Sequence, residues 1–374
     1  MASPTASPVA SADDELLHAA AIGDSSRVRK LLEMGANINY RDPKSKQTAL
    51  LLADENEHKD LVNLLLKWNG VDLNVKDGKG QTLMSRIVGR RDETMITALL
   101  KQGINSSLHF DEIKTLLSRA MKKKDKSMVS LLLEQGLDAD LYSREIQSLV
   151  WWTMHGNDET FVKLLLERGI DPGETDGFQP MICSAARNGS VAVVQLLLDN
   201  GANLEATGMS GWTPLLYAAY YGHAAVVRQL LDKGADPNCQ SSYWETPLMR
   251  AADAGHAIIA RLLLDGGANL RTKDLSRQTA LHHAAKSGHA ECVAALLERR
   301  DVKIEARDDK DKTPLYCAAE NGHEDVVKLL LEGGANPDVE SSTGMTPLQL
   351  AISTGDRHVV EVLQKHVERV KDPT

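Results

Sequence analysis

The segment from Trp212 to Asn238, WTPLLYAAYYGHAAVVRQLLDKGADPN, is the clearest copy of a unit that recurs along this chain. Thr213 followed by Pro214 predicts the start of a helix, because a threonine hydroxyl caps a first turn and proline is tolerated within it. Gly222 predicts the end of that helix, since glycine readily adopts the positive φ of a C-cap. The segment therefore begins with a short helix of fewer than ten residues.

A second helix is expected after the glycine. Its apolar residues recur at positions i, i+1, i+4 and i+5 and so line one face, namely Val226, Val227, Leu230 and Leu231. Ala218 and Ala219 are small, which suits close approach of neighbouring helices. Gly234 closes the second helix, and the polar residues after it predict an exposed turn. Such a unit cannot bury its own apolar face, so copies must stack on one another.

The unit returns along the whole chain at nearly constant spacing. Close copies open at Thr213, Thr246, Thr279, Thr313 and Thr346. Upstream the residues diverge, but equivalent starts occur at Asp14, Thr48, Thr82, Thr115, Ser148 and Pro180. All ten intervals between these eleven starts lie between 32 and 34 residues. The chain is therefore predicted to be built from eleven repeats.

The pattern resembles the ankyrin repeat, whose signature TPLHxAA…GHxxVVxLLLxxGAdxN spans 33 residues. The resemblance covers about residues 13–370 and is strongest from Phe178 onward. It implies an all-α solenoid of antiparallel helix pairs with protruding β-turn or hairpin fingers, forming a curved superhelical rod. We expect a single domain over residues 13–370, between a disordered Ala/Ser/Pro-rich tail at 1–12 and a short tail at 371–374.

Copies three to five depart most from the pattern. Their paired alanines become Ile87–Val88, Ala120–Met121 and Thr153–Met154, and larger side chains at a close seam must spread or tilt the stack. Either compensating packing absorbs the change, or these copies form a bend or a pocket. In copy two, Asp54 replaces one of the paired alanines, and a carboxylate there is costly unless it is paired or exposed.

Proteins of the ankyrin family usually contact partners through finger tips and the end of the first helix, on the concave side. The resemblance therefore implies a partner-binding surface at Arg187, Asn188, Met209, Trp212, Tyr220, Tyr221, Tyr243, Trp244, Asp253, Lys286, Glu320 and Asn321. Eleven of the fifteen aromatic residues lie between Tyr142 and Trp244.

Tyrosine and tryptophan dominate interface energies. We hypothesise that the five aromatic residues of this surface form its central hot spot. Alternatively, each of them stiffens a finger or covers the next repeat.

Composition narrows the classes of partner. The formal net charge is −9, and phosphate binding relies on clustered cations, so nucleic acid is not expected. The four cysteines are far apart and form no CxxC pair, which argues against a zinc site or a disulfide framework. No apolar run approaches the length of a membrane span, and the N-terminus lacks the features of a signal peptide. We expect an intracellular protein, cytoplasmic, nuclear or both, that is monomeric.

The histidines do not suggest catalysis. Four of them recur at the GH position of the repeat, which favours a repeated structural hydrogen bond; they are His223, His256, His289 and His323. His282 and His283 point differently along their helix and cannot share one metal ion. No phosphate loop, nucleophile elbow or zinc-protease motif occurs, so neither cofactor nor metal is expected. The basic run at 122–126 is interpreted as solvated charge at a helix end, or else as a weak contact for an acidic or phosphorylated group.

Together these observations predict a protein–protein interaction scaffold or regulatory binding module, and not an enzyme. The alternative is an enzyme or small-molecule-binding protein with its site in the concave groove of copies five to eight. Its candidate residues are Trp151, Trp152, His155, Tyr220, Tyr221, Asp253 and Glu320. A third possibility, an adaptor for a larger machine, is disfavoured because no separate recruitment box is visible after the last copy.

Overall fold

The computed structural model describes residues 11–102, 109–123, 125–134, 150–151, 153–156, 158–167 and 169–371. The expected repeat start at Ser148, and also Trp152 and Lys124, lie outside these residues. The chain divides into two units, Met1–Ile146 and Gln147–Thr374. The predicted all-α architecture of helix pairs is confirmed within each unit. No helix among the described residues has both the length and the apolar character needed to cross a membrane.

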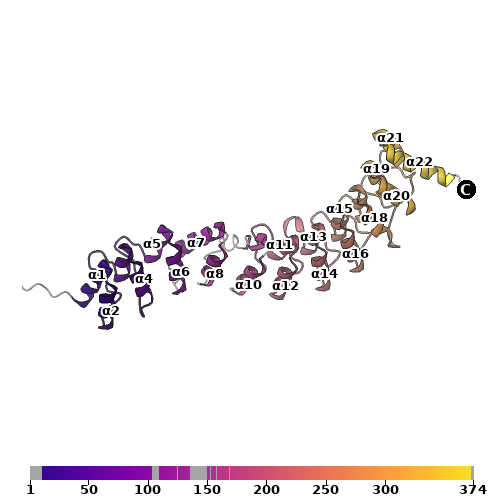
Figure 1. Ribbon diagram of the computed structural model, residues 1–374. Coiled ribbons are helices and arrows are strands. Elements are labelled where there is room, and N and C mark those ends of the chain that lie inside the picture. Colours follow the sequence, from indigo (N-terminus) through magenta and orange to yellow (C-terminus); the bar gives the residue numbers. More distant parts are fainter. Residues whose placement is uncertain are drawn as a thin grey trace, which may run out of the picture. The chain divides into compact units, whose positions relative to one another are not determined.

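In the first unit the helices pair along the chain and stack in order (Figure 1). Helix α1 packs against α2 and α3, α3 against α4 and α5, and α5 against α6 and α7. The helices of this unit are α1 (Ala12–Ile22), α2 (Ser25–Glu33), α3 (Ala49–Glu55), α4 (Lys59–Leu66), α5 (Leu83–Arg90), α6 (Glu93–Lys101), α7 (Phe110–Lys123) and α8 (Lys126–Glu134).

The second unit contains the regular copies. The first helices of its repeats form one row, from α11 to α21, and the second helices form another, from α10 to α22 (Figure 1). The first row is α11 (Met181–Asn188), α13 (Pro214–Tyr220), α15 (Pro247–Asp253), α17 (Ala280–Lys286), α19 (Pro314–Glu320) and α21 (Pro347–Thr354). The second row is α10 (Glu159–Glu167), α12 (Val191–Asp199), α14 (Ala224–Asp232), α16 (Ala257–Asp265), α18 (Ala290–Leu297), α20 (Glu324–Glu332) and α22 (Arg357–Lys371).

The helix boundaries follow from the caps that the sequence provides. Thr213 is the N-cap of α13, its hydroxyl accepts the amide hydrogen of Leu216, and Pro214 is the first helical residue. Past the C-terminus of α13, Gly222 has a φ of +86°, and a Cβ there would lie 2.7 Å from the ring of His256 in the next copy. Glycine is therefore needed at this position both for its backbone conformation and for the close approach of the neighbouring histidine.

The core is aliphatic and lies between the two rows. Ala218 and Ala219 of α13 are fully buried where α13 meets α11 and α15. Val226, Val227 and Leu230 of α14 are buried as predicted. Leu231, the fourth member of the expected stripe, is partly exposed because the buried face of α14 is narrower than the sequence pattern suggested.

Two first helices begin earlier than the spacing predicted. Helix α1 starts at Ala12, with Ser11 as its N-cap and Asp14 completing a capping box inside the helix. Helix α7 starts at Phe110, so Thr115 lies within a helix and its hydroxyl donates to the carbonyl of Asp111. Neither copy has a proline after the expected cap, and in both the acidic residues fall in the first turn, where the helix dipole favours them.

A finger precedes each first helix in copies six to eleven. Each finger is a tight loop closed by a backbone hydrogen bond between its ends, as from Ser241 to Glu245 at 3.0 Å. The fingers span residues 176–179, 208–212, 241–245, 274–278, 308–312 and 341–345.

From copy seven onward, successive fingers are also linked to one another. An amide of each finger donates to a carbonyl of the preceding finger at 2.9–3.2 Å, from Ser242 to Ser210, Leu275 to Tyr243, Asp309 to Ser276 and Ser342 to Lys310. The fingers of copies seven to eleven therefore form one continuous edge of the second unit.

Candidate partner-binding surface

Four aromatic side chains gather in copy seven. The Trp212 ring lies 5.2 Å from Tyr217 and 5.3 Å from Tyr220, and Tyr220 meets Tyr221 edge-on at 5.2 Å. Tyr217 is buried in α13, whereas Trp212 and Tyr220 are half-buried and Tyr221 is exposed. The buried Tyr217 is the base on which Trp212 rests. Tyr217 was not among the predicted site residues, because it occupies the apolar face of its helix.

Two arginines from neighbouring copies flank this cluster. The guanidinium of Arg187, at the end of α11, lies 5.3 Å from the centroid of the Tyr221 ring. Arg250 of α15 lies 5.9 Å from the rings of both Trp212 and Tyr220. Such cation–π contacts hold the rings in place. Trp212 and Tyr220 are thus enclosed between copies, and Tyr221 is the more accessible ring.

The fingers of copies six to nine carry large apolar side chains at their tips. The exposed fractions are 70% for Phe178, 61% for Met209, 56% for Tyr243, 56% for Trp244 and 55% for Leu275. Soluble proteins rarely expose several such side chains together without a binding role. Leu275 was not among the predicted residues, although it occupies the same position before its threonine as Met209 does before Thr213.

The backbone at Trp244 is left-handed, as it is at the same position of the neighbouring fingers. Its φ is +62°, a left-handed conformation that bulky side chains rarely adopt. The same position is left-handed in the other fingers from copy seven to copy eleven, at Gly211, Arg277, Asp311 and Gly344, with φ values of +71°, +59°, +53° and +73°. Finger eight thus holds a large, exposed aromatic residue where the local geometry favours glycine.

Asp253 lies at the end of α15 within a polar network. It pairs with Arg250 at 3.5 Å, accepts a hydrogen bond from the Ser287 hydroxyl at 3.1 Å, and lies 3.7 Å from the His283 ring. The neighbouring His283 ring is the largest influence that lowers the pKa of Asp253 to about 2. A carboxylate with so low a pKa is a weak general base at neutral pH.

His283 lies between two carboxylates. Besides Asp253 it contacts Asp274 of finger nine at 2.9 Å. Burial opposes protonation of His283, but the neighbouring carboxylates of Asp253 and Asp274 outweigh it and raise its pKa. The network joins α15, α17 and finger nine, and so fixes the surface on which the exposed residues stand.

The remaining predicted residues make contacts within the stack. The Asn188 amide donates to the carbonyl of Met154 at 2.7 Å, and the Asn321 amide donates to that of Cys317 at 2.8 Å. Glu320 pairs with Lys312 at 2.6 Å. Lys286 is exposed at the end of α17.

The histidines of the GH position make the predicted repeated hydrogen bond, which is confirmed. In each copy the ring Nε2 donates to a carbonyl of the preceding copy at 2.8–3.1 Å. The pairs are His58 to Ala21, His223 to Arg187, His256 to Tyr220, His289 to Asp253 and His323 to Lys286. Each histidine therefore joins two repeats.

His282 and His283 have different partners, as predicted. The Nδ1 of His282 accepts from the Thr279 amide at 3.2 Å while its Nε2 donates to the Lys312 carbonyl at 3.1 Å. Burial lowers the pKa of His282 to about 4. Within the described ranges no three His, Cys, Asp or Glu side chains are grouped so as to hold a metal ion.

The candidate residues of the alternative groove site are mostly bound to their own surroundings. His155 stacks on Trp151 at 4.1 Å, and its Nδ1 contacts the carbonyl of that residue at 2.8 Å. Asp253 and Glu320 are paired as described, and Trp152 lies outside the described residues.

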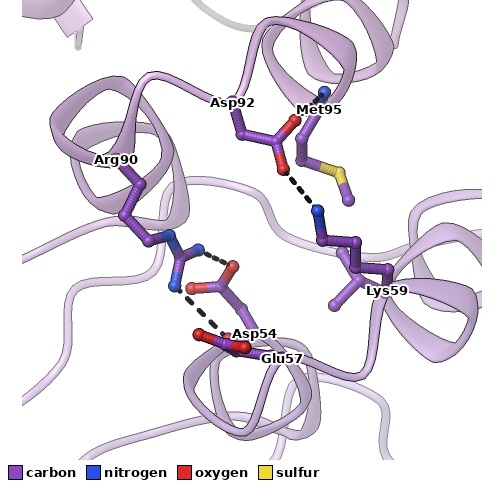
Figure 2. A pocket seen from close by; sticks show the side chains of 7 residues that line it. Asp54, Glu57, Lys59, Arg90, Asp92 and Met95 are labelled. Carbon is purple, nitrogen blue, oxygen red and sulfur yellow. Dashed lines mark hydrogen bonds and ion pairs between the residues drawn. The ribbon is translucent and has the colours of Figure 1, made fainter.

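A pocket of about 240 Å³ lies between copies two and three in the first unit (Figure 2). It is lined by Asp54, Glu57, Lys59, Val62, Arg90, Asp92 and Met95. Arg90 pairs with Asp54, and Lys59 pairs with Asp92 at 3.1 Å (Figure 2). The lining is mainly charge pairs, and the volume is below the roughly 300 Å³ at which small-molecule sites begin.

Asp54 itself is only 5% exposed. Burial raises its pKa, and the neighbouring Arg90 and Arg86 oppose that effect. Arg86 lies 3.9 Å from Asp54 and also binds Asp77, so the four side chains form one chain of opposite charges. Of the two alternatives for Asp54, paired or exposed, the structure shows the paired one, with partners that the sequence did not identify.

The pocket lies where the histidine of the GH position is missing. In copy three Asp92 takes that position, and its carboxylate binds Lys59 and the Met95 amide instead of a carbonyl of the preceding copy. An aspartate is too short to span the seam as histidine does. The departure of this copy from the pattern thus accounts for the opening.

Comparison with known proteins agrees with the geometry. A family model described as ankyrin repeats (3 copies) matches residues 9–77, 53–144, 149–241, 237–308 and 301–372. A search of curated proteins returns no match to this sequence. The matched segments cover nearly the whole chain, and the described helix pairs, threonine caps and seam histidines follow the same pattern. The chain therefore belongs to the ankyrin-repeat family.

Proposed function

We propose that this chain is an intracellular scaffold or regulatory module that binds another protein through copies six to ten. Ankyrin repeats generally mediate protein–protein interaction, and that general role is the starting point. The contact surface comprises the finger tips and the ends of the first-row helices. Its members are Arg187, Asn188, Met209, Trp212, Tyr220, Tyr221, Tyr243, Trp244, Asp253, Lys286, Glu320 and Asn321, to which we add Phe178 and Leu275.

The observation that carries the proposal is Trp244. A non-glycine residue in the left-handed conformation costs about 1 kcal/mol, and exposure of an indole contributes nothing to the stability of the free chain. Glycine stands at this position in fingers seven and eleven, and the charged residues Arg277 and Asp311 stand there in fingers nine and ten. Of these five fingers, finger eight is the one that exposes an indole at this position, and large exposed apolar side chains on neighbouring finger tips mark a binding site. We therefore assign Trp244 to the partner.

The aromatic residues divide into two roles. Trp212 and Tyr220 are enclosed by Tyr217 and Arg250, so they support the surface. Tyr221, Tyr243 and Trp244 are exposed and contact the partner directly. Rigid aromatic side chains held on such a support lose little conformational entropy when they bind.

The test compares two substitutions of exposed apolar residues in the intact chain. Trp244→Gly removes the finger-tip ring and relieves the backbone, whereas Ile258→Ala removes an exposed side chain from α16 in the other row. Affinity purification from the cells that make the protein, followed by quantitative mass spectrometry, measures capture. Thermal melting measures stability.

We expect Trp244→Gly to reduce capture of the partner roughly 30-fold, the loss typical of a hot-spot residue. Stability should stay within about 1 kcal/mol of the unmodified chain, because relief of the strained φ offsets the greater freedom of glycine when unfolded. Ile258→Ala should capture normally. Equal capture by all three chains would refute the proposal.

A further inference from the structure

The charges around the exposed aromatic residues are unbalanced. In copies six to nine the carboxylates on this side are engaged within the protein: Asp176 accepts from Ser184, Glu245 and Asp253 pair with Arg250, and Asp274 binds His283. These side chains are half-buried or buried. Their negative charge is therefore largely compensated before any partner arrives.

Three cationic side chains on the same side are exposed and form no ion pair with another described residue, namely Arg187, Arg277 and Lys286. Arg187 lies beside Tyr221, and Arg277 is the tip of finger nine, which is hydrogen-bonded to finger eight. Lys286 precedes Ser287, which contacts Asp253. The three cations thus border the exposed aromatic surface.

This local excess of positive charge contrasts with the net charge of −9 for the chain. Complementary charge at the rim of an interface guides the partner and fixes its orientation. Apolar finger tips require apolar groups opposite them, because a ring that stays in contact with water contributes no free energy of burial to binding. A ligand that fits both features carries carboxylates and large apolar side chains together.

We propose that copies six to nine bind an acidic polypeptide segment that carries aromatic or aliphatic anchors. The anchors pack on Tyr221, Tyr243, Trp244 and Leu275, and the carboxylates of the segment lie against Arg187, Arg277 and Lys286. This inference rests on the proposed function and names the chemistry of the partner. Nucleic acid fits less well, since three separate cations among apolar tips do not make a phosphate track.

The experiment selects peptides from a random display library on the intact chain. The chosen probe is the most enriched peptide, synthesised with a fluorescent label and titrated by anisotropy. We expect enriched peptides to be rich in Asp and Glu and to contain Trp, Phe or Leu. Their affinity should fall as salt is raised, because exposed charges are screened.

Two variants separate the charge from the apolar surface. Arg187→Glu combined with Lys286→Glu should weaken the peptide about tenfold, because attraction at the rim becomes repulsion. The matched control Arg228→Glu reverses an exposed charge on α14, away from the fingers, and should leave binding unchanged. Trp244→Gly tests the proposed function in the same assay.

The outcomes are distinct. If Trp244→Gly abolishes binding while the double charge reversal has no effect, or if the enriched peptides are basic or uncharged, the acidic-segment inference is wrong and the proposed function stands. If neither variant alters binding, both are wrong. Displacement of the peptide by a single-stranded oligonucleotide at equal charge concentration would identify a general polyanion site and overturn the inference.

Discussion

At the scale of single residues, Asp54 shows how a departure from the repeat is accommodated. Alanine occupies this position in the regular copies, and a lone buried carboxylate would be strongly destabilising. Arg90 and Arg86 reach across from the next copy and supply opposite charge. Arg86 is itself held by Asp77, so it serves two carboxylates from within the stack. The compensation depends on residues more than thirty positions away.

This arrangement predicts an asymmetric response to mutation. Arg86→Ala should reduce the free energy of unfolding by about 3 kcal/mol, because it leaves the buried Asp77 without its cation and Asp54 with Arg90 alone. Asp54→Ala should change it by less than about 1 kcal/mol, since Arg86 keeps Asp77 and Arg90 can turn to water. Urea unfolding followed by circular dichroism measures both values. The interpretation fails if Asp54→Ala proves as damaging as Arg86→Ala.

At the scale of helices and fingers, the second unit is held together by side chains that cross from one copy to the next. The seam histidines join consecutive copies through backbone carbonyls, and the glycine after each first helix leaves room for the ring. His283 adds a second kind of link, between α15, α17 and finger nine. These contacts fix the helix ends that present the exposed residues.

The link through His283 predicts a dependence of stability on pH. Because its pKa is raised in the folded chain, the protonated ring stabilises the fold below about pH 6.5 and loses that contribution as pH rises through the folded pKa. His283→Gln keeps a hydrogen-bonding side chain without the charge. The stability advantage of the native chain over this variant should shrink as pH is raised from about 6 to about 9. An advantage that stays constant over this interval would contradict the assignment.

Asp253 gives the opposite dependence. Its pKa is about 2 in the folded chain, so its contribution is present above about pH 4 and is lost as pH falls toward 2. Acid unfolding of Asp253→Asn should therefore begin from a lower stability at neutral pH and show a shallower slope between those two values. Parallel acid transitions for the two chains would argue against the network. Fluorescence of the tryptophans reports the unfolding.

At the scale of the whole molecule, the two units differ in how their seams are closed. In the second unit, copies seven to ten each supply a seam histidine. In the first unit, Asp92 and Asp125 occupy that position, and the described pockets of this unit lie at those two seams. Missing seam contacts lower the local stability of a repeat, because each copy depends on its neighbours.

Hydrogen exchange should reveal this difference along the chain. We expect the backbone amides of α5 and α6 to exchange faster than those of α13 and α17, because local opening costs less where the seam is unfilled. The exchange is carried out on the intact chain, which is then digested, and mass spectrometry of the peptides gives the exchange rates. Equal protection in these helices would show that the charge pairs of the first unit replace the histidines fully.

Much of the second unit could be predicted from local sequence. Thr213 with Pro214 marked the start of α13, and the paired alanines marked the contact between first-row helices, because caps and close packing depend on a few adjacent residues. Copy four was harder. The spacing predicts a cap at Thr115, whereas α7 begins at Phe110, six residues before the first helical residue expected there. Among site residues, Tyr217 and Leu275 were missed, since burial and finger geometry are not visible in composition.

The repeat spacing, the caps and the apolar positions already specify an all-helical ankyrin stack, because each of these signals acts over one or two turns of chain. The local sequence does not specify which charged side chains pair with one another. The pairing of Asp54 with Arg86 and Arg90 and the contact of Asp253 with His283 both arise where one copy meets the next. Packing between copies set these contacts, since the free energy of a buried charge depends on neighbours that lie far away along the chain.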